Sequence, residues 1–274
     1  MIQENVSNKG SVPSVLVVVF NIKGGVGKSF SCKLSYEAAC RKYGKENVIL
    51  IDCDTLNLGT YQAYPNDCQP LDLSNQDHLN RLLQFSEENT GKVIIVDMPA
   101  GEGEQLQNIF GANGIATFIE TFTDEGFKVK VMVPVNDDIA CTGGLEKIYQ
   151  IWGPTVEYHI VKNMRTVSLE KNYSFNALDA GSTRKVAEEQ MKVDLLVQSP
   201  DETGGLFGYT KNCVLISQID PEAYKLFIQA NGSQNLSAIS IDNIHKVVLK
   251  PARKALAQFY EKVVGRFEAS ELFN

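Results

Sequence analysis

The chain has 274 residues, of which 43% are hydrophobic and 22% are charged, and its formal net charge is −7 at pH 7. This composition fits a globular protein with a substantial core, and no apolar run approaches the about 20 residues needed to span a bilayer. Because the balance of charge is acidic, the surface as a whole repels nucleic acid, and any DNA binding must come from a local basic patch.

The N-terminus and the cysteines indicate a cytoplasmic protein. Residues 1–13, which we expect to be flexible, contain no apolar segment ahead of a cleavage site and hence no signal peptide. The six cysteines are scattered without a C-x-x-C pair. In a cytosolic chain this spacing indicates reduced thiols rather than a disulfide framework or a zinc site. It also argues against an iron–sulfur cluster held by thiolates, although a cluster shared across a dimer stays open.

Along the chain, short apolar runs rich in β-branched residues alternate with helical patterns. This alternation is typical of a parallel sheet covered on both faces. The expected strands are residues 14–21, 47–52, 92–98, 128–135 and 156–163. The expected helices are residues 27–43, 76–86, 103–123, 138–152, 183–192, 221–230 and 251–269. Gly44 is predicted to end the first helix in the αL conformation, and Pro251 fits the first turn of the last one.

These elements predict an α/β fold, with a mostly parallel twisted sheet and helices on both faces. Residues 165–212 are less regular and rich in turn residues, which indicates an insertion or lid, because a structureless loop of that length is uncommon. No repeat or linker divides the chain, so we expect one domain over residues 1–274.

The stretch "NIKGGVGKSF", residues 21–30, follows the first strand and opens the first helix. A strand, a glycine-rich turn and then Lys-Ser at a helix start form the geometry of a phosphate cradle, in which backbone N–H groups and the helix dipole face the phosphates. Lys28 can reach the β- and γ-phosphates, and the Ser29 hydroxyl can coordinate Mg²⁺. The general P-loop pattern has glycine where this chain has Ile22.

Phosphoryl transfer also needs acids that hold Mg²⁺ and orient water. "VILIDCD" places Asp52 and Asp54 at the end of the second strand, and "VIIVDMPAG" places Asp97 at the end of a later one. Ligands of open α/β sheets bind at the carboxyl ends of the strands. Either run alone is a weak indication, because many folds contain apolar runs that end in Asp, but the three elements in this order form a strong one.

The loop "NIKGGVGKS" resembles the deviant Walker A motif, K-G-G-x-G-K-[ST], of the ParA/MinD family of ATPases. The resemblance covers about residues 14–163 and implies ATP and Mg²⁺ as cofactors. It implies that Lys23 reaches the nucleotide of the second subunit in an ATP-dependent homodimer, whereas a role in cis is the alternative. The nucleotide-binding residues would be Gly24, Gly25, Val26, Gly27, Lys28, Ser29 and Phe30. Phe30 stands where the family has a second hydroxyl.

Further roles are implied by the same resemblance. Asp52 and Asp97 would contact Mg²⁺ through its waters, together with Ser29. Asp54 would polarise the attacking water, unless it only caps a loop. Asn163 would contact the adenine, although an Asn at a strand end is more often a turn residue.

The sequence leaves open which partner such an ATP-dependent switch acts on. "IDCDTLNLGTYQAYP" is loosely similar to the TraL-type ATPases of plasmid conjugal transfer and stability, so DNA partition or conjugation, through nonspecific DNA or a DNA-bound adaptor protein, is one expectation. This expectation is supported by a basic segment near the C-terminus, in which Glu261 is the only acid. The same segment can equally be a solvated helix face. Its basic residues are Lys246, Lys250, Arg253, Lys254, Lys262 and Arg266.

The last helix, residues 251–269, supports a second possibility, a MinD-like ATPase that associates with membranes. Apolar residues recur on it at helical spacing: Ala252, Leu256, Phe259, Tyr260, Val263 and Phe267. This spacing fits an interfacial helix, but it is more commonly found in a helix that packs on its own sheet. A third possibility is an interaction module that has lost turnover, against which the intact lysines and acids argue.

Overall fold

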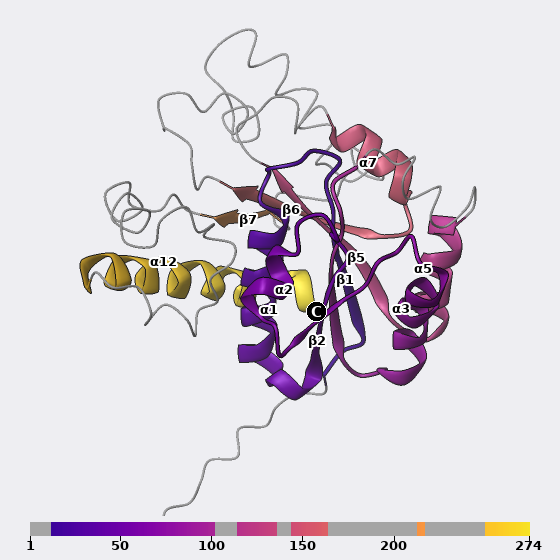
Figure 1. Cartoon of the computed structure of the whole chain (residues 1–274), viewed down its shortest axis with the longest axis horizontal. Helices are drawn as coiled ribbons and strands as arrows, with labels where there is room; N and C mark the ends of the chain where they lie inside the picture. The colour runs from indigo at the N-terminus through magenta and orange to yellow at the C-terminus, as the bar shows by residue number, and fades with distance from the viewer. Residues whose placement is uncertain (1–11, 102–113, 136–143, 164–212, 217–249) are drawn as a thin grey trace, which may run out of the picture.

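The computed structural model describes residues 12–101, 114–135, 144–163, 213–216 and 250–274 (Figure 1). The irregular segment 165–212 and the expected helices 183–192 and 221–230 lie outside these residues. So do most of residues 1–13, which were expected to be flexible, and the first parts of the helices expected at 103–123 and 138–152.

A seven-stranded sheet runs through the described residues, and every neighbouring pair of its strands is parallel. Its order is β3-β2-β4-β1-β5-β6-β7. The strands are β1 (Val15–Val19), β2 (Val48–Asp52), β3 (Cys68–Pro70), β4 (Val93–Asp97), β5 (Lys128–Val135), β6 (Glu157–Asn163) and β7 (Cys213–Ile216). β1 and β4 are buried at every residue, because a parallel sheet has both faces covered. The predicted α/β fold is confirmed.

The two strands that the sequence did not predict lie at the edges of the sheet. β3 has three residues and contains Pro70, and β7 has four residues. Runs this short show no periodicity, and a proline within a run argues against a central strand. The five strands that were predicted form the continuous middle of the sheet.

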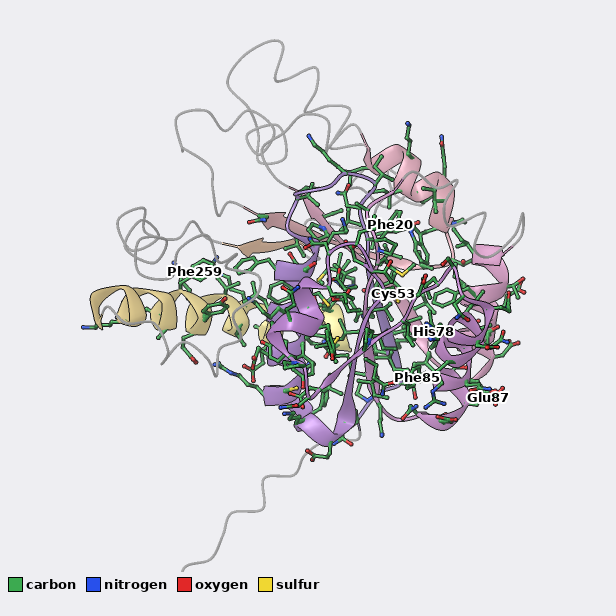
Figure 2. All side chains as sticks on the ribbon, in the orientation of Figure 1. Phe20, Cys53, His78, Phe85, Glu87 and Phe259 are labelled. Carbon is green, nitrogen blue, oxygen red and sulfur yellow. The ribbon has the colours of Figure 1, made fainter. Side chains whose placement is uncertain are left out.

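Helices cover both faces of this sheet (Figure 1). On one face pack α1 (Lys28–Tyr43), α2 (Gly59–Ala63) and α12 (Lys250–Ala269). On the other pack α3 (Gln76–Glu88), α5 (Gly114–Asp124) and α7 (Leu145–Trp152). Two 3₁₀ turns, η1 (Lys45–Asn47) and η6 (Glu271–Phe273), complete the described helical elements. Figure 2 shows Phe259 of α12 and Phe85 of α3 on opposite sides of the sheet, in the two separate cores.

Gly44 ends α1 with a positive φ, but not in the predicted αL conformation. Its φ is 89° and its ψ is 144°, whereas αL requires a ψ near +47°. Its N–H still donates to the Cys40 carbonyl, so the last turn of α1 closes before the chain extends toward η1. The prediction was right about the need for glycine and wrong about the backbone region.

The apolar face of α12 packs against α1. Phe259, Tyr260, Val263 and Phe267 are buried in the core that α1 and β1 also line. Arg41 of α1 donates two hydrogen bonds of 2.8 Å to the carboxylate of Glu261, the acid that interrupts the basic segment. A residue buried inside the protein cannot also lie in a membrane interface, so the burial of these four residues favours a helix packed on its own protein over the membrane-associating alternative. None of the described helices has the length and apolar character to cross a bilayer.

Candidate nucleotide-binding site

The glycine-rich loop connects the end of β1 to the first residue of α1, Lys28, as the motif predicts. Gly25 and Gly27 have φ values of 76° and 95°, which lie in the left-handed region that favours glycine. At Gly27 a side chain would also meet the amide of Asn163. The Ser31 N–H donates to the Gly27 carbonyl at 2.9 Å and begins the helical ladder. The loop therefore has the compact geometry of a phosphate cradle.

Asn21, which the sequence did not single out, holds the start of this loop. Its side chain is fully buried; its Nδ2 donates to the Pro134 carbonyl at 2.8 Å, and its Oδ1 accepts from the Lys23 N–H at 2.9 Å. Asn21 thereby fastens the Lys23 backbone to the end of β5. The Lys23 side chain itself is partly buried. An Asn just after an apolar strand looks like an ordinary turn residue, so only the tertiary contact to Pro134 shows its role.

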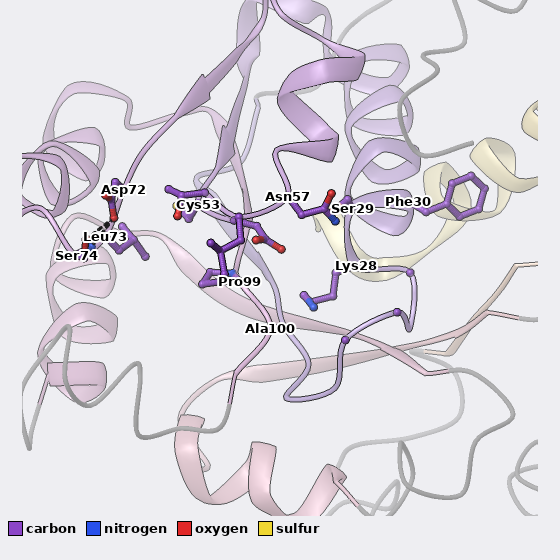
Figure 3. Close-up of a pocket in the computed structure, with 16 residues that line it drawn as sticks. Lys28, Ser29, Phe30, Cys53, Asn57, Asp72, Leu73, Ser74, Pro99 and Ala100 are labelled. Atoms are coloured by element: carbon purple, nitrogen blue, oxygen red, sulfur yellow. Dashed lines mark hydrogen bonds between the residues drawn. The ribbon is translucent and has the colours of Figure 1, made fainter. Parts of the chain in front are cut away.

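Lys28 points into the pocket in front of the loop (Figure 3). Its side chain is buried, and burial lowers the pKa of its ammonium, while the nearby Asp97 and Asp54 raise it in part. A desolvated ammonium close to acids is suited to a highly charged anion such as a polyphosphate. This placement agrees with the predicted role of Lys28.

The predicted acids Asp52 and Asp97 lie side by side, as paired residues of the adjacent strands β2 and β4. Both are fully buried. Burial raises the pKa of Asp97 to about 7, with a further increase from the charge of Asp52, while the nearby hydroxyls of Thr60 and Ser29 oppose the shift. Burial also raises the pKa of Asp52 to about 6, against the hydrogen bonds of backbone amides. Without a cation, these acids are therefore held partly protonated near neutral pH.

The two carboxylates differ in what they contact. Asp52 accepts hydrogen bonds from three backbone N–H groups, those of Asp54 at 3.0 Å, Thr60 at 3.1 Å and Tyr61 at 2.9 Å. Asp97 accepts from the Thr60 hydroxyl through Oδ2, at 2.7 Å, and its Oδ1 has no hydrogen-bond partner among the described residues. The buried carboxylate oxygen without a partner thus belongs to Asp97.

These atoms fit a Mg²⁺ ion that is held mainly by nucleotide and water. The unpartnered Oδ1 of Asp97 and the nearby hydroxyl of Ser29 are hard oxygen donors of the kind that Mg²⁺ prefers. In the described part of the chain, no group of three or more His, Cys, Asp or Glu residues gathers into a metal cage. Mg²⁺ usually keeps several waters and takes one or two carboxylates plus phosphates, so a cage is not required.

A pocket of about 630 Å³ opens in front of the loop (Figure 3). Asp54 lines it from the segment after β2, where the resemblance places the residue that orients water. Leu56 in the same segment is 97% exposed, the one large hydrophobic side chain so exposed among the described residues. The remaining walls come from the glycine loop, from the segment after β3 and from the start of the segment after β4: Gly24, Gly25, Gly27, Ser29, Asp72, Leu73, Ser74, Pro99 and Ala100.

Phe30 was predicted to contact the nucleotide, but its side chain points away from the phosphate loop (Figure 3). The ring is buried and stacks on Phe259 of α12, with centroids 6.1 Å apart, and it also contacts Tyr260. The Lys33 ammonium lies 5.3 Å from the centroid of the same ring. The side chain of Phe30 thus joins α1 to α12. Phe30 is nevertheless among the residues that line the pocket, so its contact with the nucleotide, through the backbone, stays a prediction.

Asn163, at the end of β6, lies behind the glycine loop. Its Nδ2 donates to the Val26 carbonyl at 2.9 Å, in a buried position. The structure thus gives Asn163 and Val26 a shared role in supporting the loop. The contact of Asn163 with adenine stays a prediction.

The comparisons with known proteins add little beyond this geometry. The sequence matches no protein-family model and no curated protein. Several solved structures are similar to the chain. One is a putative plasmid partition protein of Borrelia burgdorferi B31 bound to AMPPNP, with 13% identity over 67% of this chain and 98% of that one (TM-score 0.40). Another is a nucleotide-binding protein of Archaeoglobus fulgidus in complex with ADP, with 15% identity over 66% and 86% (TM-score 0.36). A further one is cobyrinic acid a,c-diamide synthase of Mycobacterium smegmatis with bound ADP and magnesium, with 16% identity over 72% and 99% (TM-score 0.38). At these values the likeness carries no argument about function. The parallel sheet and the glycine loop before α1 are by themselves the P-loop α/β fold that the sequence predicts.

Proposed function

We propose that this chain is an ATP-binding and ATP-hydrolysing switch of the ParA/MinD type, which dimerises with ATP and acts in plasmid DNA partition or conjugal transfer. The observation that carries the proposal is that Lys28 and Ser29 line the pocket in front of a loop that contains a second lysine, Lys23, while Asp97, with its unpartnered buried oxygen, lies close to both. An anion with an accompanying divalent cation satisfies all of these groups at once.

In this proposal each group has a separate task. The N–H groups of residues 24–30 and the Lys28 ammonium bind the phosphates of ATP, and Ser29 and Asp97 hold Mg²⁺, which supplies neutralisation of the phosphate charge. Asp54 orients the attacking water from the segment after β2. Lys23, whose backbone Asn21 fixes, extends toward the nucleotide of the second subunit and stabilises charge there.

The partner surface that we propose is α12. Lys254 and Lys262 are exposed on this helix, and Glu261, the acid among them, is paired with Arg41. Nonspecific DNA, or an adaptor bound to DNA, suits such a surface, because backbone phosphates need neutralising cations and no sequence readout.

The direct test uses Lys28→Ala and Lys23→Ala in parallel with the wild-type chain. We expect Lys28→Ala to lose ATP binding, measured by calorimetry with Mg²⁺ present, because Lys28 is the lysine that lines the pocket among the described residues. We expect Lys23→Ala to bind ATP but to stay monomeric by light scattering. Lys128→Ala, an exposed lysine at the start of β5, is the matched control and should behave as wild type.

Either variant can contradict the proposal. Wild-type ATP affinity in Lys28→Ala would remove the site. ATP-dependent dimers of Lys23→Ala would remove the trans role but leave the nucleotide site in place. Absence of phosphate release from the wild-type chain, despite ATP binding, would support the interaction module without turnover.

A further inference from the structure

Thr60 lies in the first turn of α2 and contacts both of the buried acids. Its backbone N–H donates to Asp52, and its hydroxyl donates to Asp97. Its side chain is fully buried. Thr60 therefore joins the segment after β2 to the acid at the end of β4.

Asp52 fixes where Thr60 stands. Its two carboxylate oxygens accept the N–H groups of Asp54, Thr60 and Tyr61, so the segment from residue 54 to 61 is folded around this one side chain. Charged acceptors that hold several backbone amides are strong and geometrically defined. Asp52 therefore acts on the polypeptide that follows it, and this use of its oxygens distinguishes it from Asp97.

The Thr60 hydroxyl in turn fixes the orientation of the Asp97 carboxylate. It occupies Oδ2 at 2.7 Å and leaves Oδ1 without a partner, in a position with no exposure to solvent. A buried carboxylate oxygen without a partner is costly, and a cation would satisfy it. Because Oδ2 is held by Thr60, the oxygen available to that cation is always Oδ1.

We propose that Thr60 is a positioning residue for the divalent cation of the nucleotide: it holds Asp97 through Oδ2 and presents Oδ1 to the metal. This inference rests on the proposed nucleotide site and adds to it a residue outside the loop motif. The hydroxyl, not the bulk of the side chain, is the group that acts. The same contact connects the metal to Asp54, because Thr60 and Asp54 are held by the same Asp52 carboxylate.

The test measures Mn²⁺ affinity in the presence of ADP, by the electron paramagnetic resonance signal of free Mn²⁺, for wild type, Thr60→Val and Thr60→Ser. Valine keeps the shape and the backbone N–H and removes only the hydroxyl. We expect Thr60→Val to bind Mn²⁺ about 10- to 100-fold more weakly, the usual effect of losing a group that orients a metal ligand. ADP affinity without metal should be unchanged, and Thr60→Ser should restore Mn²⁺ affinity.

Thr121→Val is the matched control, because the Thr121 hydroxyl also donates one hydrogen bond, to the Thr117 carbonyl, on an exposed face of α5. Thermal melting of all variants checks that they are folded. Wild-type Mn²⁺ affinity in Thr60→Val would overturn the inference, and so would an equal loss in Thr60→Ser, which would point to packing. If the wild-type chain itself binds neither ADP nor Mn²⁺, the proposed function fails, and the inference falls with it.

Discussion

The side-chain amide of Asn163 donates to the carbonyl of Val26 at 2.9 Å, and it occupies the space next to Gly27 that a side chain would need. The end of β6 thus supports the phosphate loop from behind. Three strands converge on this loop, because β1 leads into it, β5 contacts its start through Asn21 and Pro134, and β6 contacts its middle. The geometry of the loop is fixed before any ligand binds, which is what a preorganised phosphate site needs.

Gly27→Ala tests this support. Alanine would be strained at a φ of 95° and would also displace Asn163, so we expect the free energy of unfolding to fall by about 2 kcal/mol or more. ATP affinity should fall as well. Gly24→Ala is the control for stability, because a side chain there meets nothing within 4 Å and the φ of Gly24 is not positive. Urea unfolding of the two variants without nucleotide gives the comparison, and equal stabilities would contradict the packing argument.

Asn21→Ala tests whether Lys23 needs a fixed backbone position for its proposed role in the dimer. The substitution removes the hydrogen bonds to Pro134 and from Lys23 but leaves Lys28 untouched. We therefore expect near-normal ATP binding and a marked loss of ATP-dependent dimers by light scattering. Asn47→Ala removes a comparable hydrogen bond, to the Tyr43 carbonyl, far from the loop, and should dimerise normally. Normal dimers of Asn21→Ala would show that Lys23 finds its place unaided.

Asp97→Asn should make the protein more stable in the absence of metal and nucleotide. Burial raises the pKa of Asp97 to about 7, above that of the unfolded chain, so the folded state binds this proton more tightly. The contribution to stability is complete below about pH 4 and is lost as pH rises to about 7. At pH 8 we expect Asn to raise the free energy of unfolding by about 1–3 kcal/mol, and at pH 4 to change it little.

Denaturant unfolding at pH 4 and pH 8 measures this difference. Mg²⁺ added to the ADP-bound protein provides the control, since it should further stabilise the wild type but not Asp97→Asn, which lacks the charge for the cation. If Asp97→Asn is less stable than the wild type at pH 8 without ligand, the claim that the buried charge of Asp97 destabilises the folded state is wrong.

How much of this site was predictable depends on whether a residue acts locally or across the fold. The loop, Lys28 and the two buried acids follow from short patterns, because a phosphate cradle and a strand-end acid are encoded within a few neighbouring residues. Thr60 and Asn21 could not be recognised, because their roles depend on contacts to Asp97 and Pro134, which are distant in the chain. Phe30 shows the converse, since its position in the motif suggests a ligand contact and tertiary packing on Phe259 turns the ring away.

The same distinction applies to the sheet and to α12. The five central strands contain apolar, β-branched residues that the sequence shows directly, whereas β3 and β7 are short and depend on the neighbours that they pair with. For α12 the periodicity predicted an apolar face but not what covers it. Only the structure shows that α1 does.

Phe259→Ala tests that packing and, with it, the alternative of a membrane helix. The ring is 7% exposed and stacks on Phe30, so we expect a loss of about 3–5 kcal/mol in the free energy of unfolding. Gln258→Ala, the exposed neighbour, should change stability by no more than about 0.5 kcal/mol. If Phe259→Ala left stability intact and lowered binding to anionic liposomes, α12 would be an interfacial helix after all.

Asp54→Ala should retain ATP and lose hydrolysis, because Asp54 lines the pocket beside the phosphate loop and its proposed task is to orient water. With ATP this variant is expected to accumulate as a dimer, which presents two copies of α12 together.

We expect the Asp54→Ala dimer to bind nonspecific duplex DNA with ATP but not with ADP. Its DNA affinity should be lower at 200 mM than at 50 mM salt, by a factor on the order of 10³ if about six phosphates are neutralised. Adding Lys262→Ala should weaken binding and reduce the salt slope, whereas adding Lys147→Ala, on the opposite face of the sheet, should do neither. DNA binding that ignores the nucleotide would separate α12 from the switch. Undiminished phosphate release by Asp54→Ala would remove Asp54 from its role, because a water that needs no orienting group at this position must be activated elsewhere.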